Sequence, residues 1–114
     1  MDNEIKKFLY DIRESVYSIE NYLDTHLGEH RNFFAYMENK MLRRAVEREF
    51  EIIGEAMNRI NKLMPDIAVS AKHQIIGMRN RVIHGYDKID DEIIWGTIVR
   101  HLPLLQKEID KLLE

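Results

Sequence analysis

Hydrophobic residues recur at alternating three- and four-residue steps along most of the chain, which is the period of amphipathic helices. The first such segment predicts a helix over residues 3–25, and Asp2 or Asn3 can cap its first turn. Residues 26–32 are mostly polar and contain a glycine, so we expect a break there. The aromatic-rich segment 33–37 predicts a short helical turn that covers one end of the core. The apolar positions of the first helix are Ile5, Phe8, Ile12, Val16, Ile19 and Leu23.

A second long helix is predicted over residues 40–63, with Asn39 as its cap and Pro65 just beyond its end. Gly54 lies inside this helix, where glycine costs about 1 kcal/mol relative to alanine. Its expected benefit is the close approach of a neighbouring helix. The apolar face consists of Leu42, Val46, Phe50, Ile53, Met57, Ile60 and Met64.

The C-terminal part of the chain predicts a further helix that Asp90 or Asp91 can cap. Pro103 should kink this helix near Val99, because proline removes one backbone hydrogen bond and clashes with the preceding turn. No alternation typical of strands occurs. The pattern therefore predicts an all-α fold, an antiparallel bundle of four main helices with a short extra helical turn, in which residues 1–114 form a single domain.

Composition narrows the classes of protein that this chain can be. It has 114 residues, 45% hydrophobic and 32% charged, with five Gly and two Pro, which is typical of a folded, helix-rich domain. No apolar run approaches the length that crosses a bilayer, and the acidic N-terminus lacks a signal-peptide core, so we expect a cytoplasmic protein with no membrane partner. The absence of cysteine excludes disulfides and thiolate metal sites. A net charge of −3 argues against coating nucleic acid by bulk electrostatics, so such contacts must be local.

The third predicted helix, from a cap at Ser70 to His84, carries an arginine where an apolar residue is expected. Helical spacing places Arg79 inside the arc of the apolar residues of this helix, Ile75, Met78 and Val82. A guanidinium stays charged, and its isolated burial costs several kcal/mol. Arg79 therefore needs a carboxylate partner, a subunit interface or an anionic ligand.

Polar residues gather at the end of the same helix. Asn80 and His84 are spaced i, i+4 and share one side, and Gly85 can adopt the left-handed conformation that ends a helix. His84 and Tyr86 would then lie at the exposed rim. An arginine, an amide, an imidazole and a phenol at one helix end can bind and process a phosphate.

Arg79, His84 and Tyr86, in the pattern Arg-x4-His-x-Tyr, resemble the signature of HEPN-domain ribonucleases, specifically the HepT-like toxins of prokaryotic toxin–antitoxin pairs. The resemblance covers most of the chain from about residue 40 onward. The other segments that carry it are Ala45-Val46-Glu47-Arg48, Phe50-Glu51-Ile52-Ile53-Gly54-Glu55-Ala56, Asp90-Asp91-Glu92-Ile93-Ile94-Trp95 and Leu102-Pro103-Leu104-Leu105.

The resemblance implies a metal-independent endoribonuclease toxin that needs no cofactor and acts on RNA rather than DNA. It implies a homodimer with a composite cleft at the dimer interface, and a nucleotidyltransferase antitoxin that attaches AMP to Tyr86. RNA cleavage without a metal needs one group to accept the 2′-hydroxyl proton and one to protonate the leaving oxygen. We expect His84 to be the acid/base, Arg79 to clamp the phosphate and Asn80 to be a positioning donor.

Each of these residues also has an ordinary structural interpretation. Arg79 can form a salt bridge within the bundle, with Glu49 as the geometric candidate and Glu51 or Glu55 as others. His84 can interact with the helix dipole, and Tyr86 can cover the helix end. Two further functions therefore remain open, a noncatalytic nucleotide-binding partner of a nucleotidyltransferase and a structural helical adaptor.

Three other features are given structural interpretations. His26 and His30 match an inverted zincin pattern, but Gly28 interrupts the segment and no third ligand is evident, so we expect a solvated connection. We interpret Trp95 as a core anchor. The basic run is expected to be a solvated helix face and a secondary candidate for RNA or antitoxin contacts; it consists of Lys40, Arg43, Arg44 and Arg48.

Overall fold

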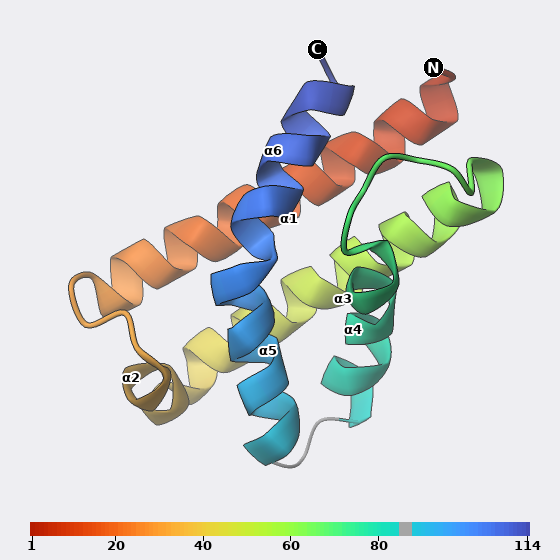
Figure 1. Ribbon diagram of the computed structural model, residues 1–114. Helices are drawn as coiled ribbons and strands as arrows, with labels where there is room; N and C mark the ends of the chain where they lie inside the picture. Colours follow the sequence, from red (N-terminus) through yellow and green to blue (C-terminus); the bar gives the residue numbers. More distant parts are fainter. Residues whose placement is uncertain (85–87) are drawn as a thin grey trace.

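The chain folds entirely into helices and connections over the part that the computed structural model describes, residues 1–84 and 88–114 (Figure 1). For residues 83, 84, 88 and 89 the structure describes the backbone only. No helix in the described part combines the length and the apolar character needed to span a bilayer. The helices are α1 (Asn3–Leu27), α2 (Phe33–Glu38), α3 (Lys40–Leu63), α4 (Lys72–His84), α5 (Lys88–Arg100) and α6 (Leu102–Leu112).

The caps of the first three helices form as short-range hydrogen bonds. The Asp2 carboxylate accepts from the Ile5 amide at 2.9 Å, and the Asn39 side chain accepts from the Leu42 amide at 3.0 Å. Gly28 ends α1 with a φ of 51°, a conformation that L side chains rarely adopt. The predicted caps Asp2 and Asn39 are confirmed, and so are the bounds of the two long helices to within two residues.

Helices α1 and α3 run antiparallel along their lengths, and α4 also packs against α3 (Figure 1). Helices α5 and α6 follow one another in nearly the same direction and complete the fourth main element of the bundle. The predicted all-α bundle of four main helices with a short extra turn is therefore confirmed. Fully buried side chains from the main helices include Leu9, Ile12, Ile19, Phe50, Ile53, Met57, Ile60, Ile75, Ile94, Ile98 and Ile109.

Helix α2 closes one end of this core. Tyr36 is fully buried, and its ring lies 5.1 Å from that of Trp95, centroid to centroid. Burial raises the pKa of the Tyr36 phenol, and the neighbouring Glu47 carboxylate adds to this effect. Glu47 is itself buried, which raises its own pKa despite an ion pair with Arg44 at 3.2 Å. Trp95 packs against the core, as expected.

Three expectations for the C-terminal helices differ from the structure. Helix α4 begins at Lys72, one residue later than a cap at Ser70 predicts, and the Ser70 hydroxyl donates to Glu108 of α6 at 2.8 Å, which joins the preceding loop to α6. Helix α5 begins at Lys88, so Asp90 and Asp91, the predicted caps, lie inside its first turn. Pro103 does not kink one long helix near Val99. The helix ends at Arg100, and Pro103 lies in the first turn of a new helix, where its missing N–H needs no intrahelical acceptor.

The contact between α3 and α4 depends on Gly54. A Cβ atom at this position would lie 3.1 Å from the Cβ of Arg79, 3.2 Å from the Ile75 carbonyl oxygen and 3.3 Å from the Arg79 amide nitrogen. Two of these atoms belong to the backbone of α4, so the helix as a whole would have to move. The expected close approach at Gly54 is confirmed, and it places Arg79 directly against α3.

We expect Gly54→Ala to lower the free energy of unfolding by about 1–3 kcal/mol, the usual cost of overpacking, although alanine favours the helix. Gly77→Ala is the matched control, because a Cβ atom there meets nothing within 4 Å. That variant should gain about 0.5–1 kcal/mol. Urea unfolding followed by circular dichroism measures both. Equal stabilisation by the two substitutions would contradict the close approach.

Candidate functional site

The second half of helix α4 carries Arg79, Asn80 and His84. Arg79 and Asn80 are exposed, and His84 is the last residue of the helix. The side chain of His84, and Tyr86 altogether, lie outside the described residues. The structure therefore places the arginine and the amide, together with the helical backbone that leads to the histidine.

The Arg79 side chain begins at the α3–α4 contact and ends in solvent. Its Cβ faces Gly54, which agrees with its position in the apolar arc, but 47% of the side chain is exposed. Arg79 avoids the cost of burying its charge, because a long side chain can leave a helix contact along its stem, and it has the carboxylate partner that was one of the expected alternatives. Its Nη1 lies 2.7 Å from Oε2 of Glu55 on α3.

The carboxylate partner differs from the one that helical geometry favoured. Glu49 does not pair with Arg79; it accepts from the Tyr22 hydroxyl at 3.0 Å, and this hydrogen bond raises the pKa of the Tyr22 phenol. Glu55 instead lies between two arginines, Arg79 and Arg59, the latter at 3.2 Å. Two guanidinium groups therefore share one carboxylate, and the three side chains together carry a net positive charge.

A second ion pair joins the helices on either side of residues 85–87. Arg81 Nη1 of α4 lies 3.2 Å from Asp90 Oδ1, in the first turn of α5. Arg81 lies within the signature segment but was not singled out by its chemistry. Its partner is nine residues away on another helix, so no helical spacing could reveal the pair.

A cavity of about 440 Å³ opens between α4 and α5. Two imidazoles and two guanidinium groups line it, those of His73, Arg81, Arg100 and His101. Sequence analysis missed this groove because its two sides come from separate helices. The signal that could have pointed to it is the pair of glycines within helical segments, Gly77 and Gly96, which also line it.

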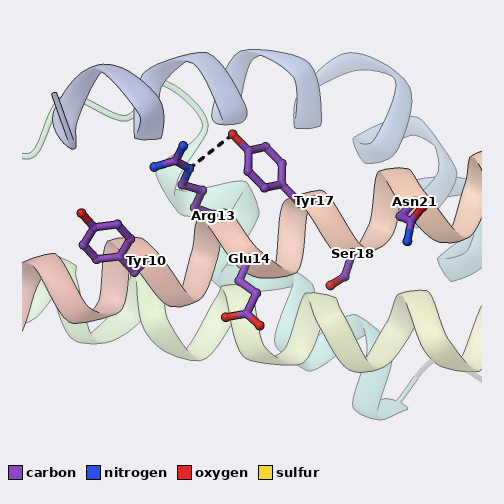
Figure 2. A pocket seen from close by; sticks show the side chains of 6 residues that line it. All are labelled: Tyr10, Arg13, Glu14, Tyr17, Ser18 and Asn21. Atoms are coloured by element: carbon purple, nitrogen blue, oxygen red, sulfur yellow. Dashed lines mark hydrogen bonds between the residues drawn. The ribbon is translucent and has the colours of Figure 1, made fainter.

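The arginines of α1 and α3 are paired within the described chain. A hollow of about 510 Å³ lies on the exposed face of α1, where Arg13 and Tyr17 point toward one another (Figure 2). Arg13 also lies 3.3 Å from Asp110, so its charge is compensated. On α3, Arg43 donates to the Met37 carbonyl, and Arg48 lies 3.6 Å from a glutamate of the next turn.

Among the described residues, no group of three or more His, Cys, Asp or Glu side chains is arranged to hold a metal ion. The functional groups that the described site does contain are guanidinium and imidazole groups, from Arg79 and from the α4–α5 groove. Groups of this kind bind phosphate oxygens and donate hydrogen bonds to them.

Comparison with known families shows which family the chain belongs to. The sequence model of the family described as "Ribonuclease HepT-like" matches residues 5–112. The chain belongs to the HepT-like ribonuclease family. The match includes α1, for which the sequence alone indicated only a generic amphipathic helix.

Several archaeal relatives resemble this HepT-like chain over nearly its whole length. A protein of Methanocaldococcus jannaschii named "Putative RNase MJ1216" is 33% identical, over 97% of this chain and 88% of the relative. A protein of Thermococcus cleftensis named "Probable ribonuclease HepT" is 30% identical over 98% of each chain. No solved structure matches the chain significantly.

We expect Arg79→Gln to lower the free energy of unfolding by no more than about 1 kcal/mol, because ion pairs this exposed contribute little. Arg59→Gln is the matched control, since Arg59 pairs with the same Glu55. Urea unfolding of both variants checks this. A loss of about 3 kcal/mol or more for Arg79→Gln alone would make Arg79 a structural residue of the HepT-like fold.

Proposed function

We propose that this HepT-like chain, as a single HEPN-like domain, is a metal-independent endoribonuclease toxin whose site lies at the interface of a homodimer. The observation that carries the proposal is Arg79, held against α3 by the contact at Gly54 yet half exposed at the guanidinium. Family membership supports RNA as the substrate. An arginine fixed at its base and half exposed at its tip can exchange its carboxylate partner for a phosphate without moving the fold.

Cleavage then proceeds by attack of the ribose 2′-hydroxyl oxygen on the adjacent phosphorus. His84 accepts the hydroxyl proton while the bond from phosphorus to the 5′-oxygen breaks, and a second acid protonates that oxygen. Arg79 stabilises the negative charge on the non-bridging oxygens, and Asn80 donates a hydrogen bond that positions the phosphate. The products are a 2′,3′-cyclic phosphate and a free 5′-hydroxyl.

The need for two proton-transfer groups argues for a dimer, since each chain supplies one His84. A two-fold axis close to the end of α4 would bring His84 of one protomer near His84 of the partner subunit. One imidazole then acts as base and the other as acid. An intact site would require both chains.

Regulation is proposed to act at Tyr86, through a partner nucleotidyltransferase antitoxin. Tyr86 follows His84 by two residues. Transfer of AMP from ATP to its hydroxyl oxygen, with release of pyrophosphate, would add bulk and negative charge beside the phosphate-binding position. Both effects oppose RNA binding.

His84→Ala should abolish cleavage of a labelled single-stranded RNA while unfolding and RNA affinity change little, because the imidazole transfers protons rather than holding the strand. Wild-type cleavage should persist in EDTA and yield 2′,3′-cyclic phosphate ends, which mass spectrometry of the products identifies. Loss of activity in EDTA with recovery in Mg²⁺ would contradict the mechanism.

The same assay separates the competing functions. A noncatalytic nucleotide-binding partner would lose nucleotide affinity in His84→Ala. A structural adaptor would show neither RNA cleavage nor nucleotide binding that depends on His84; the Arg79–Glu55 ion pair favours this alternative. Mixing His84→Ala chains with wild-type chains should give heterodimers of reduced activity. Full activity in verified monomers would contradict the shared site.

Tyr86→Phe should retain most of the ribonuclease activity and escape neutralisation, because the phenol oxygen is the acceptor for AMP and takes no part in proton transfer. Incubation with the partner nucleotidyltransferase and ATP, followed by intact-mass analysis, should show AMP-sized additions on the wild-type chain alone. Equal modification and silencing of the Tyr86→Phe chain would move the regulatory site elsewhere.

A further inference from the structure

Two glycines inside helices remain unexplained by packing. Gly77 in α4 and Gly96 in α5 both line the α4–α5 groove, and a Cβ atom added at either would meet nothing within 4 Å. Neither has a positive φ. Glycine weakens a helix interior, and here, unlike at Gly54, no neighbouring helix gains from the missing side chain. Both helices instead leave bare backbone exposed in the groove.

The groups around this bare backbone are donors of hydrogen bonds. Arg100, His73 and His101 have no ion-pair or side-chain hydrogen-bond partner among the described residues, whereas Arg81 is held by Asp90. The groove therefore concentrates guanidinium and imidazole groups in a chain whose net charge is −3. Glycine backbone at the base with basic side chains beside it is an arrangement that admits a phosphate group closely.

The groove also runs along the helix whose last residue is His84. His73, Gly77 and Arg81 follow one another at four-residue steps along α4, and residues at this spacing share one side of a helix. A strand held in the groove would therefore lead along α4 toward its C-terminal end.

We propose that the α4–α5 groove binds the ribose-phosphate backbone of single-stranded RNA next to the bond that is cut. This inference rests on the proposed ribonuclease function and names where the substrate strand lies. Arg100 and the two imidazoles contact phosphate oxygens, and the glycines let the strand approach the helix backbones. Glu92, a carboxylate that also lines the groove, can accept a hydrogen bond from a ribose 2′-hydroxyl, which DNA lacks.

The decisive variant is Gly77→Leu, which places a larger side chain in the groove lining at a position where an added Cβ atom meets nothing within 4 Å. Binding is measured by fluorescence anisotropy with a labelled single-stranded RNA, on the His84→Ala chain so that the probe stays intact. We expect at least about a tenfold loss of affinity with a melting temperature equal to or above that of the parent. Gly77→Ala should give a smaller loss in the same direction, because a methyl group covers the bare backbone and leaves most of the groove open. Asn21→Leu, the control, adds a leucine on the exposed face of α1 outside the groove and should bind within about twofold of the parent.

Charge gives a second, independent readout. Arg100→Gln should weaken binding and reduce the slope of log affinity against log salt by about one, as expected when one phosphate contact is lost. Lys107→Gln is the matched control, because Lys107 is exposed on α6 and does not line the groove. An unchanged slope in Arg100→Gln would remove the phosphate contact from the proposal.

Other occupants of the groove predict different results. A folded Gly77→Leu chain that binds RNA like its parent, or a parent that binds no RNA, would overturn the proposal. The same holds if Gly77→Leu blocks association with a second copy or a protein partner but spares RNA binding. Displacement of the RNA by AMP or ATP at equal concentration would make the groove a site for free nucleotides.

The groove and the proposed catalytic residues can fail separately. Cleavage lost in His84→Ala but unchanged in Gly77→Leu would refute the groove alone. Cleavage that persists in His84→Ala would refute the catalytic assignment, while the anisotropy result would still decide the groove.

Discussion

Helices α3 and α4 can approach closely because residue 54 has no side chain. The backbone of α4 lies so near Gly54 that a single methyl group would contact the Ile75 carbonyl and the Arg79 amide at 3.2 and 3.3 Å. This contact fixes how α4 is rotated about its own axis against α3. The same rotation directs the opposite side of α4, with Gly77 and Arg81, toward α5, so both the arginine site and the groove depend on it.

The position of Arg79 follows from this contact and resolves an apparent conflict in its sequence position. Its Cβ lies in the helix interface, where an apolar residue is expected, while its guanidinium reaches water and Glu55. An ion pair half exposed to solvent contributes little to folding and can exchange one anionic partner for another. A residue of this kind is fixed in place by packing and remains available to a ligand.

Glycine has opposite roles at different points of this bundle. The backbone of α4 packs directly against Gly54, whereas Gly77 and Gly96 face open space between α4 and α5. The sequence shows a glycine in a helical segment at all three positions and cannot distinguish them, because the difference lies in what stands opposite. Packing explains the first, and the RNA strand that we propose for the groove would account for the other two.

The sequence by itself determined the features that depend on neighbouring residues. Apolar periodicity located α1 and α3, and the caps at Asp2 and Asn39 formed because each bonds an amide three residues away. The spacing of Arg79 and His84 indicated the family for the same reason. Only the tertiary structure decided that Arg79 pairs with Glu55 rather than Glu49, that Ser70 binds Glu108, and that α4 and α5 enclose a groove. These outcomes depend on how helices rotate and slide against one another, and that is set by the sum of many small contacts between distant residues, which no local pattern encodes.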